Sequence, residues 1–205
     1  MKIIAINGSH RAGENTAKLL NCALEEAQAL GAETELIELS ELDIKYCVGC
    51  NRCLFKPDCS IKDDDMEDLK AKMLEADGII FGSPDYFSNV SARMKCFMDR
   101  TRPMHMVANQ LKGKVTGYLS MSGLDNCGAE HTNEVLRQFC ATHETITVNP
   151  RPEGPVIAST ICGSLMAGMK EGKPRWRRSV DEDEIAPVVA RQLGKDIVEM
   201  INKLN

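Results

Sequence analysis

The chain has 205 residues, of which 27% are charged, and a formal net charge of -5. This length suits one domain with a full core, and the lack of a basic excess argues against nucleic-acid binding. No apolar run approaches the roughly 18 residues of a membrane-spanning helix, and residues 1–8 lead into a strand and a turn, not an apolar signal segment. We therefore expect one cytoplasmic domain, residues 1–205, that binds neither membranes nor nucleic acid and keeps its nine cysteines reduced.

Apolar runs alternate with segments of helical period, a pattern typical of a parallel sheet with helices on both faces. The predicted strands are 2–6, 34–39, 78–81, 115–121 and 145–148. The predicted helices are 16–30, 66–75, 92–102, 130–141 and a last one that starts near Asp183 or Glu184. That start is required because Pro187 is compatible only with a first helical turn.

The loop after the first predicted strand has the features of a phosphate site. Ser9 and Thr16 offer hydroxyl groups, Arg11 offers a cationic fork, and the following helix contributes backbone N–H groups and a favourable dipole. The loop matches neither G-x-G-x-x-G nor G-x-x-x-x-G-K-[ST], so it indicates a phosphomonoester and not a dinucleotide or triphosphate. The alternative is an ordinary polar turn in which Asn15 or Thr16 caps the helix.

Four cysteines follow the second strand with the spacing C-x2-C-x2-C-x5-C: Cys47, Cys50, Cys53 and Cys59. Dense cysteine-only ligation of this kind is typical of [4Fe-4S] clusters. Structural zinc and a redox-switching disulfide are the alternatives, but zinc sites usually split their ligands into two distant pairs. We predict a cluster in the loop 45–62.

A second loop, Gly82–Ser91, follows the third strand and carries a longer motif. Its sequence Gly-Ser-Pro-x-Tyr-Phe-x-Asn-Val-Ser, followed by Met-Lys-x-Phe-x-Asp-Arg, resembles a flavin loop of the NADPH-dependent FMN reductase family. The first loop resembles that family's phosphate loop. With the cysteines in place, the chain resembles the iron-sulfur flavoproteins in particular, over about residues 1–140.

This resemblance implies a flavodoxin-like, doubly wound five-stranded parallel sheet of order 2-1-3-4-5, noncovalent FMN and a [4Fe-4S] cluster. It implies that Ser9, Arg11, Asn15 and Thr16 hold the phosphate, with His10 as a further candidate. The candidate residues beside the ribityl chain and ring are Ser83, Pro84, Asp85, Tyr86, Phe87, Ser88 and Asn89. Asp85 departs from the family pattern, since relatives more often have a small or apolar residue at this position. A carboxylate beside the flavin disfavours an anionic reduced ring. The alternative role of Tyr86 and Phe87 is plain core packing.

The third loop, Ser120–Gly128, contains fewer glycines than its family counterparts. Ser122 and Gly123 are candidates for contact with the other side of the flavin. Cys127 is interpreted as a small loop filler, the alternative being a position near the flavin ring. Cys22, Cys96 and Cys140 lie on predicted helices and are expected to be inert core residues.

Residues 149–179, called the arm below, fit no regular pattern and end in the basic run Lys173–Arg178. One interpretation is a docking surface for an acidic redox protein or a nicotinamide phosphate, since Arg binds such groups bidentately. The other, which we favour, is a solvated loop packed by Trp176. The arm and the last helix, residues 149–205, complete the predicted domain.

We predict an FMN-dependent oxidoreductase in which a ferredoxin-like one-electron donor reduces the cluster and FMN serves a small two-electron acceptor. No residue is assigned a catalytic acid-base or nucleophilic role. The alternatives are an NAD(P)H-dependent FMN, quinone or nitroaromatic reductase and a cluster-based redox sensor. The resemblance also implies a homodimer or homotetramer in which the cluster of one copy approaches the FMN of a neighbour.

Overall fold

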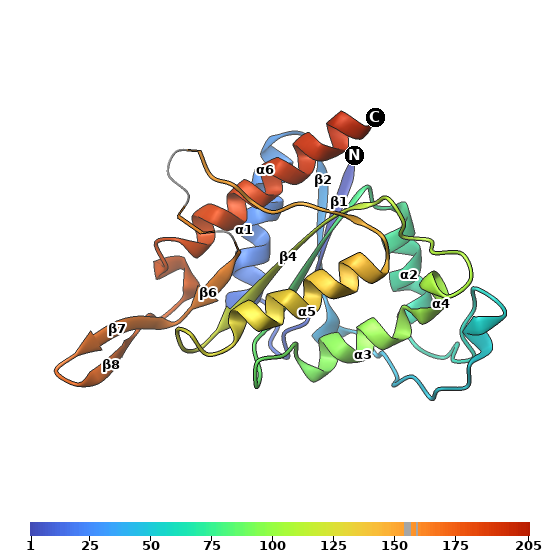
Figure 1. Ribbon diagram of the computed structural model, residues 1–205, viewed down its shortest axis with the longest axis horizontal. Helices are drawn as coiled ribbons and strands as arrows, with labels where there is room; N and C mark the ends of the chain where they lie inside the picture. Colours follow the sequence, from blue (N-terminus) through green and yellow to red (C-terminus); the bar gives the residue numbers. More distant parts are fainter. Residues whose placement is uncertain (154–156, 159) are drawn as a thin grey trace.

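The computed structural model describes residues 1–153, 157–158 and 160–205; residues 154–156 and 159 of the arm lie outside the described residues. Its centre is a parallel sheet with the strand order β2-β1-β3-β4-β5, which confirms the predicted flavodoxin-like α/β topology (Figure 1). The strands are β1 (Lys2–Asn7), β2 (Glu33–Glu38), β3 (Gly78–Pro84), β4 (Val115–Ser122) and β5 (Ile146–Thr147).

The fifth strand position is divided between two segments of the chain. β5 pairs only with the start of β4, opposite Val115 and Thr116. A further strand, β6 (Cys162–Ser164), pairs with the end of β4, opposite Ser120–Ser122. The sequence did not predict β6, because three residues of the type Cys-Gly-Ser show no strand periodicity.

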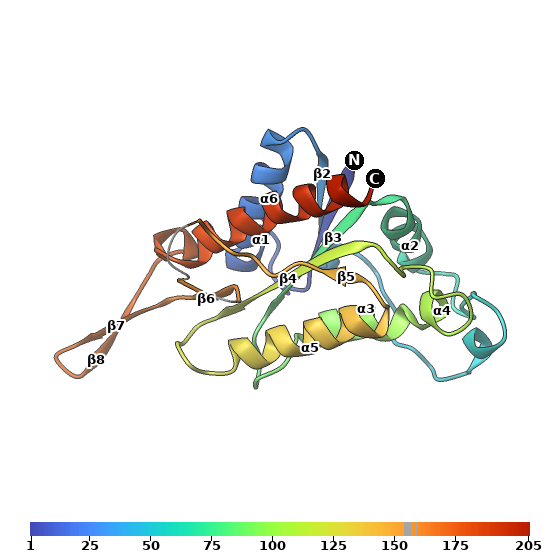
Figure 2. The same cartoon turned by 45° about the horizontal axis from the view of Figure 1, so that its top comes forward.

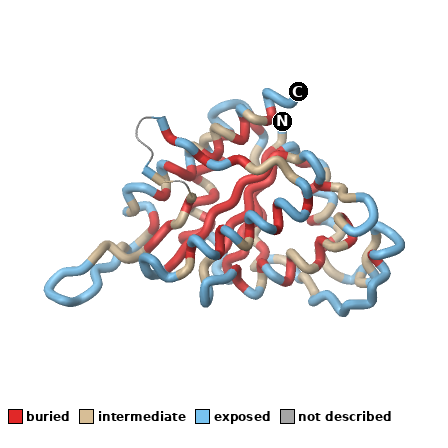
Figure 3. Tube along the Cα trace, viewed as in Figure 1, coloured by how far each residue is buried: buried red, intermediate tan, exposed pale blue. Residues whose placement is uncertain are grey.

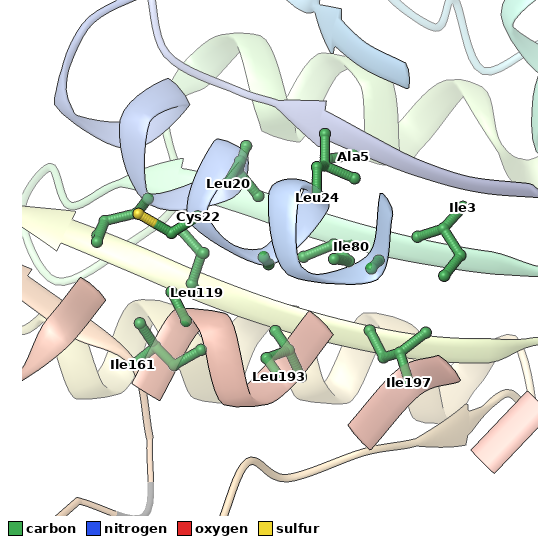
Figure 4. Close-up of a cluster of buried hydrophobic side chains, with 14 of the residues drawn as sticks. Ile3, Ala5, Leu20, Cys22, Leu24, Ile80, Leu119, Ile161, Leu193 and Ile197 are labelled. Atoms are coloured by element: carbon green, nitrogen blue, oxygen red, sulfur yellow. The ribbon is translucent and has the colours of Figure 1, made fainter. Parts of the chain in front are cut away.

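Helices cover both faces of the sheet, as predicted (Figures 1 and 2). One face carries α1 (Asn15–Ala29) and α6 (Ala186–Leu204), and the other carries α2 (Met66–Glu75), α3 (Ala92–Arg100), α4 (Arg102–His105) and α5 (Ala129–Thr142). The close-up in Figure 4 shows Leu20 of α1 and Leu193 of α6 gathered over Ile80 of β3 and Leu119 of β4. Figure 3 shows that the central strands are buried along most of their length.

The two helices of the first face pack unusually closely at Gly194. A Cβ atom at this position would lie 2.0 Å from the carbonyl oxygen of Ala23. Only glycine therefore allows α6 to cross α1 at this distance.

Two helix boundaries differ from the prediction. The predicted helix 92–102 stops at Arg100, and α4 begins two residues later with Pro103 in its first turn. α6 begins at Ala186, slightly later than expected, because Asp183 Oδ1 accepts hydrogen bonds from the N–H groups of Ile185 (2.9 Å) and Ala186 (3.0 Å).

The arm contains strands that the sequence did not predict. It contains β6 and an antiparallel hairpin of β7 (Met166–Lys170) and β8 (Lys173–Trp176) that projects from the body (Figures 1 and 2). Trp176 is 54% exposed, so the expectation that it packs this segment is wrong. Three short 3-10 helices, η1 (Leu39–Glu41), η2 (Arg52–Leu54) and η3 (Val180–Glu182), complete the elements of the described residues. Within the described residues, no helix combines the length and apolarity needed to cross a bilayer.

Candidate functional site

Three loops leave the carboxyl ends of β1, β3 and β4 and surround one cavity of about 210 Å³, called the edge cavity below. This is where ligands bind in open parallel sheets. Nine of the predicted cofactor-binding residues line it: Ser9, Arg11, Asn15, Thr16, Pro84, Asp85, Tyr86, Ser122 and Gly123. Residues from all three predicted loops therefore meet at one place.

The first loop is held by the side chains that flank it. Asn7 Oδ1 accepts a hydrogen bond from Ser9 N (3.0 Å), and Ser9 Oγ accepts one from Arg11 N (3.1 Å). Glu38 at the end of β2 accepts from Asn7 Nδ2 (2.6 Å) and Gly13 N (2.9 Å). These hydrogen bonds fix the loop backbone and leave the Arg11 guanidinium without an ion pair among the described residues.

The start of α1 faces this loop without a side-chain cap. The helix begins at Asn15, its N-cap is Glu14, and neither Asn15 nor Thr16 acts as a cap, so that alternative is wrong. Asn15 Oδ1 instead accepts from Val180 N (2.9 Å), which ties η3 to the loop. An uncapped helix start presents N–H groups and a partial positive charge, both suited to an anion.

The second loop is a tight, strained turn. Asp85 N donates to Met121 O (2.7 Å) and Tyr86 N donates to Asn89 O (3.0 Å). Phe87 and Ser88 between them adopt positive φ angles of 55° and 57°, a costly conformation that is typical of functional loops. Phe87 is fully exposed and Tyr86 is 46% exposed, so the core-packing alternative is wrong for both.

The second loop is tied to its neighbours on both sides. Ser91 caps α3 by accepting from Met94 N (3.0 Å) and donates to Gly8 O (2.5 Å) in the first loop. Gly128 of the third loop, with φ of 105°, approaches Ser88 so closely that an added Cβ would lie 2.2 Å from its Oγ. The three loops thus form one connected rim.

The other five predicted cofactor residues lie outside the edge cavity. Ser83 is fully buried and accepts from Ser91 N (3.0 Å), which makes it part of the loop's support. His10 stacks on Tyr86 with 5.9 Å between ring centroids. Phe87, Ser88 and Asn89 are exposed on the rim. The sequence did not identify three further lining residues: Glu14, Met121 and Leu165.

The four cysteines line a second, separate cavity, called the cysteine cavity below. It shares no lining residue with the edge cavity and lies beside α4. Figures 1 and 2 show the cysteine loop, in teal, at one end of the molecule and the β7–β8 hairpin at the other. Cys47 and Cys50 are exposed, Cys59 is half-buried and Cys53 is buried. Ser60 Oγ lies 3.1 Å from Cys50 Sγ, and this hydrogen bond lowers the pKa of the Cys50 thiol.

The four thiols are suitable ligands for an iron-sulfur cluster, but the cavity that they line is too small for one. Four thiols surround one cavity, but its volume of about 20 Å³ has room for little more than one water molecule. Among the described residues, no group of three or more His, Cys, Asp or Glu side chains is arranged to hold a metal ion. Cluster ligation by these cysteines therefore stays a prediction, and it requires the loop to open.

A fully buried ion pair joins the two ends of the cysteine loop. Arg100 of α3 contacts Asp64 through both terminal nitrogens, the longer contact being 3.2 Å from Nη2 to Oδ1, and Nη1 donates to Lys45 O (2.7 Å). Asp64 also accepts from Lys45 N (3.0 Å). Burial would raise the pKa of the Asp64 carboxyl, but hydrogen bonds from Arg100 and from backbone N–H groups lower it overall. Asp64 was not identified from the sequence.

The three cysteines on α1, α3 and α5 are core residues, as predicted. Cys22, Cys96 and Cys140 are buried, and burial raises the pKa of the Cys140 thiol to about 12. Such a thiol stays protonated and unreactive.

Comparison with known proteins decides the family. Residues 1–152 match the family model "NADPH-dependent FMN reductase". An iron-sulfur flavoprotein of Methanocaldococcus jannaschii is 38% identical over 201 residues, covering 98% of this chain and 97% of the relative. The chain belongs to the iron-sulfur flavoprotein family. A second member, from Archaeoglobus fulgidus, is 40% identical over 200 residues, covering 98% of this chain and 95% of the relative.

As a member of this family, the protein is an FMN-dependent oxidoreductase. Solved structures support its fold. RosB with a bound flavin intermediate matches with a TM-score of 0.75 at 16% identity, covering 100% of this chain and 80% of that chain. A WrbA-like flavodoxin from Agrobacterium tumefaciens matches with a TM-score of 0.60 at 18% identity, covering 100% and 98%.

Proposed function

We propose that this iron-sulfur flavoprotein takes electrons from a one-electron donor such as a ferredoxin, passes them through a [4Fe-4S] cluster to FMN, and delivers them in pairs to a small acceptor. The observation that carries the proposal is the pairing, in one chain of this family, of a three-loop edge cavity with a separate cavity lined by four cysteines. When bound, the two groups supply one-electron storage and two-electron transfer.

In this proposal the FMN phosphate lies at the first loop. Arg11 supplies a charge-assisted contact, Ser9 and Thr16 supply hydroxyl groups, and the uncapped start of α1 supplies N–H donors. The second and third loops border the rest of the cofactor, where the exposed Tyr86 and Phe87 shield it from water.

The cluster is held by Cys47, Cys50, Cys53 and Cys59. Arg100 and Asp64 fix the two ends of their loop, so the loop can open between its ends without releasing the rest of the fold. These thiols remain available to iron only in a reducing compartment, which is why the cytoplasm is part of the proposal.

We further propose that the protein works as a homodimer or homotetramer in which the cluster of one copy serves the FMN of a neighbour. The two cavities of one chain share no residue. The cysteine loop also exposes large apolar side chains, Tyr46 and Phe55 being 76% and 81% exposed. Single exposed residues are common, but several on one projecting loop favour a protein contact.

Anaerobically purified protein tests the proposal directly. Iron and FMN are quantified first, and stopped-flow absorbance then follows reduction by a reduced ferredoxin and by NADPH. Fast reduction by ferredoxin with about four irons per chain supports the proposal. Fast steady reduction by NADPH alone would instead favour a direct reductase, and cluster-dependent partner binding without turnover would favour a sensor.

A further inference from the structure

Asp85 is held in a fixed position at the edge cavity by a residue behind the cavity. Its backbone N–H donates to Met121 O (2.7 Å), and its Oδ1 accepts from Thr132 Oγ1 at 2.6 Å. Thr132 is fully buried in α5 and does not line the cavity. Asp85 therefore lines the cavity, while its carboxylate is held in place by a hydrogen bond from a residue behind the cavity wall.

The charges around Asp85 do not neutralise it. Arg11 and Glu14, both from the first loop, are the other charged residues that line the described cavity. Asp85 forms no ion pair with any described residue, and its one side-chain hydrogen bond comes from a neutral hydroxyl. Among the described residues, the cavity thus contains Arg11 without an ion pair on the first loop and the fixed carboxylate of Asp85 on the second loop.

We propose that Asp85, positioned by Thr132, lowers the reduction potential of the FMN bound in this cavity. The inference rests on the proposed placement of FMN. Reduction of the ring by two electrons with uptake of one proton leaves one negative charge, whereas uptake of two protons leaves none. A nearby carboxylate raises the free energy of the charged product, and exclusion of water between the carboxylate and a bound ring strengthens this repulsion.

The test compares the midpoint potential of bound FMN in the wild type, Asp85→Asn and Asp125→Asn. The change of Asp85 to asparagine keeps the size of the side chain and removes its charge, while Asp125 is an exposed carboxylate on the third loop outside the cavity. We expect Asp85→Asn to favour reduction about tenfold, which for two electrons is about 30 mV. Asp125→Asn should leave the potential near that of the wild type.

Variants of Thr132 test the positioning role and remain informative if Asp85→Asn releases its FMN. Thr132→Val removes the hydrogen bond and should raise the potential by less than Asp85→Asn does. Thr132→Ser keeps the hydroxyl, so its potential should equal that of the wild type.

Equal potentials for the wild type, Asp85→Asn and Thr132→Val would overturn the proposal. So would an unchanged potential together with an altered ratio of FMN to riboflavin affinity, because that result places Asp85 at the phosphate. A wild-type protein without FMN would instead contradict the proposed function itself.

Discussion

The edge cavity and the cysteine cavity are built in different ways. The loops of the edge cavity are short and follow directly from strands of the sheet. Ser91 of the second loop donates a hydrogen bond to Gly8 of the first, and Gly128 of the third loop packs closely against Ser88 of the second. The cysteine loop is long, contains one 3-10 turn and is fixed to α3 at its ends by Arg100. The first region is organised by the fold itself, whereas the second depends on two anchors and on what binds between them.

This difference has a thermodynamic consequence. A site whose ligands are not pre-arranged gains much of its order when the metal binds, so metal affinity and loop order are coupled. A rim held by sheet and loop hydrogen bonds requires little rearrangement for its ligand. Perturbing the cysteine loop should therefore affect iron without affecting flavin.

The largest expected effect comes from removing a thiol. Cys50→Ser and Cys53→Ser should each abolish iron binding while FMN stays bound, since the two cavities share no residue. Cys127→Ser is the matched control, because Cys127 is an exposed cysteine outside both cavities. Iron analysis and flavin absorbance of anaerobic protein measure both. Loss of FMN together with iron would show that the two regions are not independent.

The five predicted strands could be found because each is a short run rich in Ile, Val, Leu or Thr between helical segments. The order of strands, both helical layers and the convergence of three loops followed from that pattern and from the family motifs. β6 was missed because the sequence Cys162–Ser164 has no composition typical of a strand. It forms a strand only through its backbone pairing with Ser120–Ser122. Leu165 reaches the edge cavity only through that pairing, so it was missed as well.

The second largest effect is expected at the buried ion pair. Arg100→Met leaves Asp64 buried without its partner, and breaking such a pair typically costs about 3 to 5 kcal/mol of stability. Urea unfolding measures this free energy. Arg102→Met is the control, because Arg102 lines the same cavity and, among the described residues, its side chain makes only a long 3.4 Å hydrogen bond to Asn51. Equal stability of the two variants would mean that Arg100 does not anchor the loop.

The anchoring of the cysteine loop lies beyond what the sequence could show. Arg100 belongs to a family motif, but its partner Asp64 sits in a run of three aspartates, of which the sequence gives no reason to prefer one. Thr132 is a similar case, since a threonine within a helix has no pattern that links it to Asp85 on another loop. Pairings between distant side chains depend on packing that a one-dimensional pattern does not contain.

Acid should lower the free energy of unfolding through protonation of His143, which lies close to the α3 anchor of the cysteine loop. Its Nε2 lies 3.0 Å from Thr101 Oγ1, directly after Arg100, and burial, with a smaller effect of His105, lowers the pKa of His143 to about 4. In the unfolded chain, His143 binds a proton as the pH falls through about 6.5. The contribution of neutral His143 to the free energy of unfolding is therefore fully present above that pH and is lost as the pH falls to about 4. A shift of this size corresponds to roughly 3 kcal/mol.

The variant His143→Gln isolates this effect. The free energy of unfolding of the wild type should fall between pH 6.5 and 4 relative to that of the variant, and the difference should level off below pH 4. Urea unfolding at several pH values gives both curves. Parallel curves over this range would show that His143 titrates alike in the folded and unfolded protein.

The smallest expected effect concerns the edge cavity, where several groups of the first loop and the start of α1 share the proposed contacts to the FMN phosphate. Arg11→Ala should weaken FMN retention by about 1.5 to 3 kcal/mol through loss of a charge-assisted contact to the phosphate. Because riboflavin lacks the phosphate, its affinity should hardly change, and fluorescence titration of both flavins measures the difference. Arg175→Ala, an exposed arginine on the hairpin, is the control. An equal loss for FMN and riboflavin would place Arg11 away from the phosphate, and loss of all flavin binding would mean that the rim depends on this one residue.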